Sequence, residues 1–223
     1  MANESLLWTG EWWVWVTSGL LLAAPPPLPA QELLVGIRGG AGSSAVWYQD
    51  HNAIDQVDLK AGFHLGAGIA RELSSHLEAE LVLLYTQGGY RGKGGQPWDL
   101  WLDYVEIPLL LRLKLPTSVF PYLTLGVAPR FQVRCRMVDV SVVGQTACDD
   151  PVLGKRWKSL DLATLWGVGT GMGVGPGALL LELDLGVGLL DINDDSLPPG
   201  WARNVDLRLS ATYRLPWSRG ERP

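Results

Sequence analysis

The chain has 223 residues, of which 47% are hydrophobic and only 18% charged, and its formal net charge is -5. Soluble domains carry about 25% charged residues, so this composition favours a membrane-associated protein. No run reaches the roughly 18 apolar residues that a transmembrane helix needs, so any spanning elements are expected to be strands. The mild negative charge, without a basic tract, excludes nucleic acid as an expected partner.

The first 30 residues resemble a secretory signal peptide. An apolar run from Trp12 to Ala24 is followed by prolines and by a small residue, Ala30, at the expected cleavage site. Acidic residues precede the apolar run, where Lys or Arg is usual, so the position of the start codon is left undecided. A short membrane anchor is the alternative to a cleaved signal peptide. We expect residues 1–30 to be removed and residues 31–223 to form one barrel domain.

Apolar and polar residues alternate with a period of two along most of the remaining chain, which is the pattern of β-strands. Every odd-numbered residue from Val205 to Trp217 is apolar, whereas the residues between them are mostly polar or charged. Each segment is near or above the roughly 9 to 11 residues that a tilted strand needs to cross a bilayer. The predicted strands are 33–42, 61–73, 77–88, 100–115, 121–136, 160–174, 178–191 and 204–217.

Short and long connections alternate between these strands. The turn at 175–177 is tight, whereas the connections at 43–60 and 137–159 are long. Short periplasmic turns and long outer loops are typical of outer-membrane barrels. The sequence therefore predicts an all-β fold, an eight-stranded antiparallel up-and-down transmembrane β-barrel. Alternation is also compatible with a soluble, lipocalin-like barrel, in which the apolar side chains point inward instead.

The charged residues of the predicted strands share a face with many glycines, and small residues suit the inside of a narrow barrel. An eight-stranded interior is just wide enough to be filled by side chains, so we expect the charges to pair and plug it. Arg130 and Arg134 are expected to reach across strand 160–174 to Glu182 and Asp184. The predicted network comprises Arg38, Glu80, Glu106, Arg112, Lys114, Arg130, Arg134, Glu182, Asp184, Asp206, Arg208 and Arg214.

A glycine occupies every second position from Gly167 to Gly177. A phosphate-binding loop with glycines would lead into a helix, but a strand-like segment follows here. We therefore expect glycines 167, 169, 171 and 173 to provide space in the lumen. Residues 175–177 are expected to form a tight turn.

Aromatic residues fall near both ends of the predicted strands, as interfacial girdles do. Tyr122, Tyr213 and Trp217 are at the turn ends, and Phe63, Tyr85, Trp101 and Phe131 lie towards the loop ends.

The two cysteines of the chain, Cys135 and Cys148, bracket part of the longest loop. An even pair in an exported chain predicts one disulfide rather than a zinc site. It would close a loop of about 14 residues and stabilise the fold by about 3 kcal/mol in the chain-entropy model.

Several segments together resemble the PorT-like outer-membrane β-barrel family, also described as porin-family proteins. The most specific are "LLYTQGG" and "YVEIPLLL", and the others are "GIRGG", "GFHLG" and "PYLTLGVAPRF". The resemblance covers about residues 33–217 and implies an eight-stranded barrel in the outer membrane of a Gram-negative-type bacterium. It implies no role for any single residue.

We expect a structural or surface-interaction role through the long outer loops, without a cofactor or metal. Expected partners are outer-membrane lipids, lipopolysaccharide and the barrel-assembly machinery, with the protein itself a monomer. The basic and aromatic residues of segment 90–101 are compatible with a contact to lipopolysaccharide, but an ordinary solvated loop with interfacial anchors is the favoured interpretation of that segment. The alternatives are a lipid A-modifying enzyme, a soluble periplasmic carrier and a small-ion channel. An enzyme is not expected, because the three histidines, His51, His64 and His76, are dispersed and none falls on the apolar face.

Overall fold

The computed structural model describes residues 33–48, 57–92, 98–139, 144–147, 158–192 and 201–217. The predicted signal peptide, residues 1–30, lies outside them. Within the described ranges no helix is long and apolar enough to cross a membrane.

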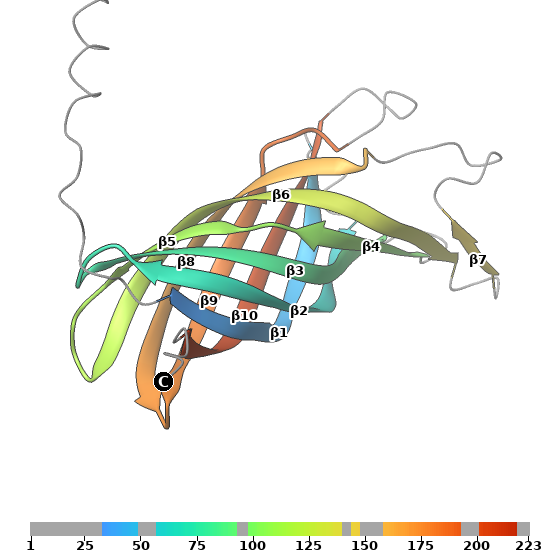
Figure 1. The fold of residues 1–223 in the computed structure, drawn as a ribbon. Helices are drawn as coiled ribbons and strands as arrows, with labels where there is room; N and C mark the ends of the chain where they lie inside the picture. Colours follow the sequence, from blue (N-terminus) through green and yellow to red (C-terminus); the bar gives the residue numbers. More distant parts are fainter. Residues whose placement is uncertain are drawn as a thin grey trace, which may run out of the picture. The chain divides into compact units, whose positions relative to one another are not determined.

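The described chain folds into antiparallel strands that close into a barrel (Figure 1). The ring closes because β1 pairs with both β10 and β2. β4 and β5 occupy one place in the wall, since both pair with β3 and with β6. The wall therefore has eight positions, which confirms the predicted eight-stranded barrel. The strands are β1 (Leu33–Tyr48), β2 (Val57–Glu72), β3 (Leu77–Gly92), β4 (Trp98–Glu106), β5 (Leu109–Lys114), β6 (Val119–Asp139), β7 (Gly144–Ala147), β8 (Leu160–Val174), β9 (Gly177–Gly188) and β10 (Ala202–Trp217).

One predicted strand, 100–115, is interrupted at Ile107 and Pro108. Proline has no N–H to donate to a ladder, so the break falls where the hydrogen-bond pattern has to change. The wall stays closed there, because the N–H of Val82 donates to the Pro108 carbonyl at 3.0 Å and the N–H of Ile107 donates to the Pro129 carbonyl at 3.0 Å.

Several strands extend further at the loop end than the alternation predicts. β1 continues to Tyr48, β6 continues to Asp139, and β7 pairs with the outer end of β6. Small residues at 43–45 of β1 and the adjacent apolar residues Met137 and Val138 of β6 interrupt the period of two, although their backbone groups still pair.

The turn predicted at residues 175–177 is present between β8 and β9. Val174 pairs with Gly177, which leaves Gly175 and Pro176 as a two-residue loop. Gly175 has a φ of +59°, a left-handed conformation that favours glycine. The glycine run therefore ends in a hairpin.

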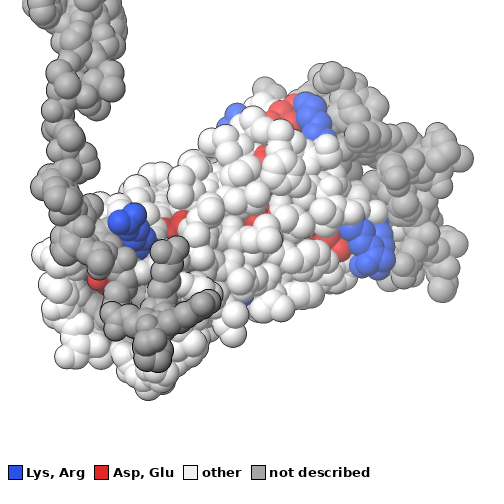
Figure 2. Space-filling view, in the orientation of Figure 1, with Lys and Arg blue, Asp and Glu red and all other residues white. Residues whose placement is uncertain are grey.

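The barrel is apolar outside and polar inside. On β10, Leu207 and Leu209 are 47% and 62% exposed, whereas Arg208 and Ser210 are 6% and 1% exposed. Figure 2 shows the same arrangement on the surface, where the middle of the barrel is mostly white and the charged side chains gather nearer its ends. A soluble barrel has the opposite arrangement, and soluble monomers rarely expose so large an apolar surface. This is the pattern of a transmembrane barrel.

Candidate functional site

The interior holds two clusters of ion pairs. The turn-side cluster is centred on Arg112, whose Nη1 lies 2.6 Å from Glu80 Oε2 and whose Nε lies 3.0 Å from Glu182 Oε2. Arg38 Nη2 lies 2.6 Å from Glu182 Oε1 and 2.5 Å from Asp184 Oδ2. Together with Arg214 of β10, which pairs with Glu78 and Glu80, these side chains link five strands across the lumen. The turn-side cluster consists of Arg38, Glu78, Glu80, Arg112, Glu182, Asp184 and Arg214.

The loop-side cluster lies further along the lumen and is built around Glu106. Arg208 binds both oxygens of Glu106 with its two terminal nitrogens, at 2.8 and 2.9 Å. Arg130 contacts the same carboxylate at 3.2 Å and Asp206 at 2.6 Å. Such paired guanidinium–carboxylate contacts are strong and fix the orientation of both groups. The loop-side cluster consists of Glu106, Arg130, Asp161, Asp206 and Arg208.

Small polar side chains fill the space between the ion pairs. Thr124 donates to Glu182 Oε2 at 2.9 Å, and Ser210 donates to Asp184 Oδ2 at 3.3 Å. His64 Nε2 lies 2.9 Å from the Ser210 hydroxyl and is 2% exposed. His64 therefore lies inside the barrel, and its ring is part of the packed lumen.

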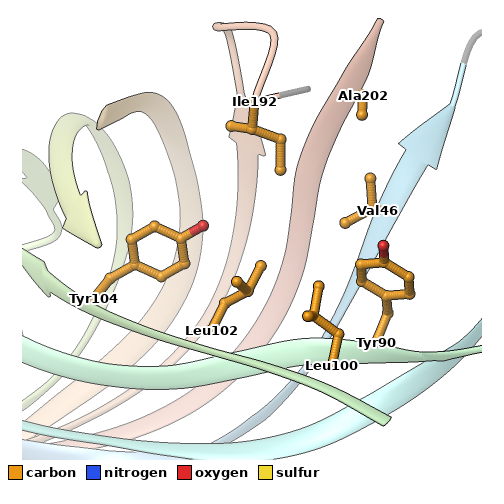
Figure 3. Close-up of a cluster of buried hydrophobic side chains, with 7 residues drawn as sticks. All are labelled: Val46, Tyr90, Leu100, Leu102, Tyr104, Ile192 and Ala202. Atoms are coloured by element: carbon orange, nitrogen blue, oxygen red, sulfur yellow. The ribbon is translucent and has the colours of Figure 1, made fainter. Parts of the chain in front are cut away.

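An apolar cap lies above the loop-side cluster, at the loop end of the lumen (Figure 3). Tyr104 joins the cap to the charges below it, since Asn204 Nδ2 donates to the Tyr104 hydroxyl at 3.3 Å and to Asp161 at 2.9 Å. This cap was not predicted from the sequence, although Leu100, Leu102 and Tyr104 alternate in phase with the inward-facing Glu106. The cap consists of Val46, Tyr90, Leu100, Leu102, Tyr104, Ile192 and Ala202.

A cavity of about 30 Å³ remains beside the loop-side cluster. It is lined by His64, Thr86, Tyr104, Glu106 and Asp206, among other residues. This volume corresponds to about one water molecule, and the polar lining suits water.

The glycines of β8 and β9 provide the space in which these groups sit. A Cβ atom on Gly167 would lie 2.5 Å from Asp184 Oδ1, and one on Gly169 would overlap the Tyr122 ring. On β9, a Cβ on Gly186 would lie 2.8 Å from Arg130 Nη2. The lumen side of these strands is thus fitted to particular neighbours.

The expected pairing of Arg130 with Glu182 and Asp184 is wrong. The β6–β8–β9 register places Thr124 beside Gly167 and Asp184, whereas Arg130 lies opposite Asp161. Six residues along a strand separate Thr124 from Arg130, about 20 Å at the usual rise. Arg130 therefore meets Glu106, Asp161 and Asp206, and Arg38 and Arg112 take the two predicted partners.

Arg134 does not belong to the network. Its neighbour Val133 is an extra residue in β6, because Asp103 pairs with Arg134 while Tyr104 pairs with Gln132. Such a bulge reverses the alternation beyond it, and Arg134 is exposed on the outer wall. The period-two alternation alone predicts that Arg134 points into the barrel.

Two further predictions concern the turn end. Lys114 forms ion pairs with Glu72 and, at 3.9 Å, with Glu78, so it closes the turn end of the network.

Tyr122 does not belong to the predicted aromatic girdle. It is 4% exposed, and its hydroxyl donates to the Leu181 carbonyl at 3.3 Å inside the barrel.

Glu78 and Asp161 were not predicted as members of the network. The alternation of the sequence could have assigned both residues to the lumen, since Glu78 shares its strand face with Glu80, and Asp161 shares its face with Gly167. Glu78 pairs with Arg112 and Arg214, and Asp161 lies 3.9 Å from Arg130.

The predicted disulfide stays a prediction, because Cys148 lies outside the described residues. Cys135 packs against the apolar cap. Within the described ranges no group of three or more His, Cys, Asp or Glu side chains is arranged to hold a metal ion.

No family model and no curated protein match this sequence. Among solved structures, the chain is similar to Ail, the attachment invasion locus protein of Yersinia pestis, with 14% identity, a TM-score of 0.44, and coverage of 82% of this chain and 99% of that one. It is also similar to neisserial surface protein A, with 13% identity, a TM-score of 0.46, and coverage of 82% and 97%. OprG of Pseudomonas aeruginosa gives 15% identity, a TM-score of 0.43, and coverage of 84% and 98%. At these values the likeness carries no argument about function.

Proposed function

We propose that the protein is an integral outer-membrane barrel of a Gram-negative-type envelope, with a plugged interior and a structural or surface-interaction role through its outer loops. The observation that carries the proposal is the inside-out arrangement of the barrel, with ion pairs inside and leucines outside. A PorT-like family membership, a monomeric state and contacts with outer-membrane lipids and the barrel-assembly machinery belong to the same proposal.

The packing of the lumen supports a plug rather than a pore. Arg112, Arg130 and Glu106 are 1–2% exposed, so the interior charges are withdrawn from water. Each of these groups meets more than one oppositely charged partner. Among the described residues, the apolar cap and a cavity of about 30 Å³ beside the loop-side cluster leave little space for a hydrated ion. Small-ion conduction is therefore not proposed.

An enzymatic role is not proposed either. Among the described residues, His64 is held inside the barrel by Ser210, and His76 lies in an exposed turn beside Ser75, where its Nδ1 is 2.8 Å from the Ser75 hydroxyl. The acidic groups near His64 are already paired with arginines. No described cluster favours acyl-chain chemistry at the outer wall.

Conductance across a planar lipid bilayer tests the plug. Protein whose folding is verified by heat-modifiable gel migration should insert without producing steady conductance steps. The replacement of Glu106 and Arg208 together by alanine removes a facing pair and supplies a variant with a loosened lumen for comparison. Reproducible steps from the unmodified protein would contradict a plugged interior.

A further inference from the structure

Two arginines of β6, Arg134 and Arg136, point away from the lumen. The bulge at Val133 reverses the strand's alternation, and beyond it Cys135 and Met137 pack against the apolar cap. Because neighbouring side chains of a strand point to opposite faces, the two arginines lie on the outer wall. Arg134 is exposed and Arg136 is half-buried.

Their neighbours on the outer wall are aromatic and polar. In the register of β4 with β6, Arg136 lies opposite Trp101 and Arg134 lies opposite Asp103. Asp103 is hydrogen-bonded by the Tyr85 side chain. Figure 2 shows charged side chains gathered at the end of the barrel where β4 begins and β6 ends in Figure 1. The arginines therefore sit at the boundary between the apolar wall and the loops.

Both guanidinium groups have free donors within the described part of the chain. Neither forms an ion pair with a described carboxylate, in contrast to Arg91, whose Nε lies 2.9 Å from Asp99 Oδ1. The Nε of Arg136 is buried and has no hydrogen-bond partner among the described residues. Within the described ranges, the two outward guanidinium groups of β6 therefore lack an anionic partner.

The wall directly below them is apolar. Phe131 and Val133, which precede the arginines on the same strand, are 45% and 56% exposed. Beyond β4, the outer wall continues with Tyr85 on β3 and Phe63 on β2; Phe63 is 47% exposed and its ring centroid lies 6.0 Å from that of Tyr85. A ligand at this place would meet cations above and hydrocarbon below, which is the division within a phospholipid or a phosphorylated glycolipid.

We propose that Arg134, Arg136 and Trp101 form a binding site for the phosphate headgroup of an outer-leaflet glycolipid. A guanidinium group presents its donors in a fork that matches phosphate oxygens, and a tryptophan ring suits the headgroup level of a bilayer. The acyl chains lie along Phe131 and Val133. The site rests on the proposed membrane location, but it is independent of the plugged lumen and the loops.

The test uses the full barrel in phosphatidylcholine nanodiscs, with phosphorylated lipid A and its dephosphorylated form as probes. Native mass spectrometry should show that the unmodified protein retains the phosphorylated form at least tenfold better. The R134Q/R136Q double variant should lose this preference. Arg71→Gln is the matched control, because Arg71 is exposed at the turn end of β2, on the other side of the membrane; it should retain the preference.

The outcomes separate this inference from the proposed function. An excess of inorganic phosphate should leave the lipid bound, and displacement by phosphate would show a free-anion site and overturn the lipid assignment. Equal retention of both lipid A forms by the unmodified protein, or an unchanged preference in R134Q/R136Q, would also overturn it. A protein that fails to insert into nanodiscs would instead contradict the membrane location.

Discussion

At the scale of single residues, the glycines of β8 differ in what they accommodate. Gly167 faces Asp184 and Thr124, and an added Cβ would lie 2.5 Å from the Asp184 carboxylate. Gly173, on the same face near the turn, would meet nothing within 4 Å. The two positions therefore provide a matched comparison.

We predict that Gly167→Ala destabilises the barrel by about 1–3 kcal/mol, because overpacking displaces a buried, paired carboxylate. Gly173→Ala should change the free energy of unfolding by much less. Urea unfolding in lipid vesicles, followed by tryptophan fluorescence, measures both. Equal stabilities of the two variants would show that the lumen relaxes freely around Asp184.

Asp99 lies at the loop end of β4, beyond the apolar wall, and titrates under the influence of two cations. The hydrogen bond from Arg91 lowers the pKa of Asp99 below its usual range, and Lys60, 2.9 Å away, adds to the effect. A lowered carboxyl pKa stabilises the fold above the unfolded value of about 3.9, and this contribution is lost as the pH falls through the folded pKa.

We predict that Arg91→Gln raises the pKa of Asp99 towards its ordinary value and weakens the pH dependence of stability below about pH 4. Carboxyl ¹³C chemical shifts followed through an acid titration measure the pKa directly. An unchanged Asp99 pKa in the variant would mean that Arg91 is not the main cause of the shift.

At the scale of strands, the least regular part of the wall lies between β2 and β3. Their pairing shifts between Leu59 and His64, where β2 has one residue more than β3. Ser44 of β1 fills the resulting gap: it accepts from the Gly89 N–H at 2.8 Å and donates to the Gly89 carbonyl at 2.9 Å. One hydroxyl therefore satisfies two backbone groups that the ladder leaves unpaired.

We predict that Ser44→Ala destabilises the barrel by about 1–3 kcal/mol, because a partly buried backbone donor loses its acceptor. The exchange of the Gly89 amide hydrogen should accelerate. Ser43→Ala is the control, since it leaves the two hydrogen bonds between Ser44 and Gly89 in place. Unchanged amide exchange in the Ser44 variant would show that water or another group closes the gap.

Strand facing was predictable from the sequence wherever the alternation is unbroken. Arg38, Arg112, Arg208 and Arg214 are all buried as expected, because a period of two fixes the side of each residue. The predicted face of Arg134 was wrong, because the sequence of a single strand does not reveal a bulge. The bulge becomes visible only in the pairing of β6 with β4.

The partners of the interior charges were harder to predict than their facing. Which acid meets Arg130 depends on the stagger of β6, β8 and β9, and that stagger is a property of the closed barrel rather than of any single strand. The apolar cap was missed for a related reason. Leu100 and Leu102 are inward-facing apolar residues, an exception to the rule that otherwise assigns apolar side chains to the outer wall.

At the scale of the whole molecule, the central claim is that the barrel lies in a bilayer with its leucines in contact with lipid. Spin labels introduced singly at positions 109 to 113 of β5, in protein folded into lipid vesicles, test it most directly. Residues 109, 111 and 113 are exposed, whereas 110 and 112 are buried.

The account predicts frequent collisions of the labels at 109, 111 and 113 with oxygen, which concentrates in the bilayer, and few with a water-soluble nickel chelate. Labels at 110 and 112 should collide little with either. Labels at 109, 111 and 113 that meet the nickel chelate more often than oxygen would contradict the account.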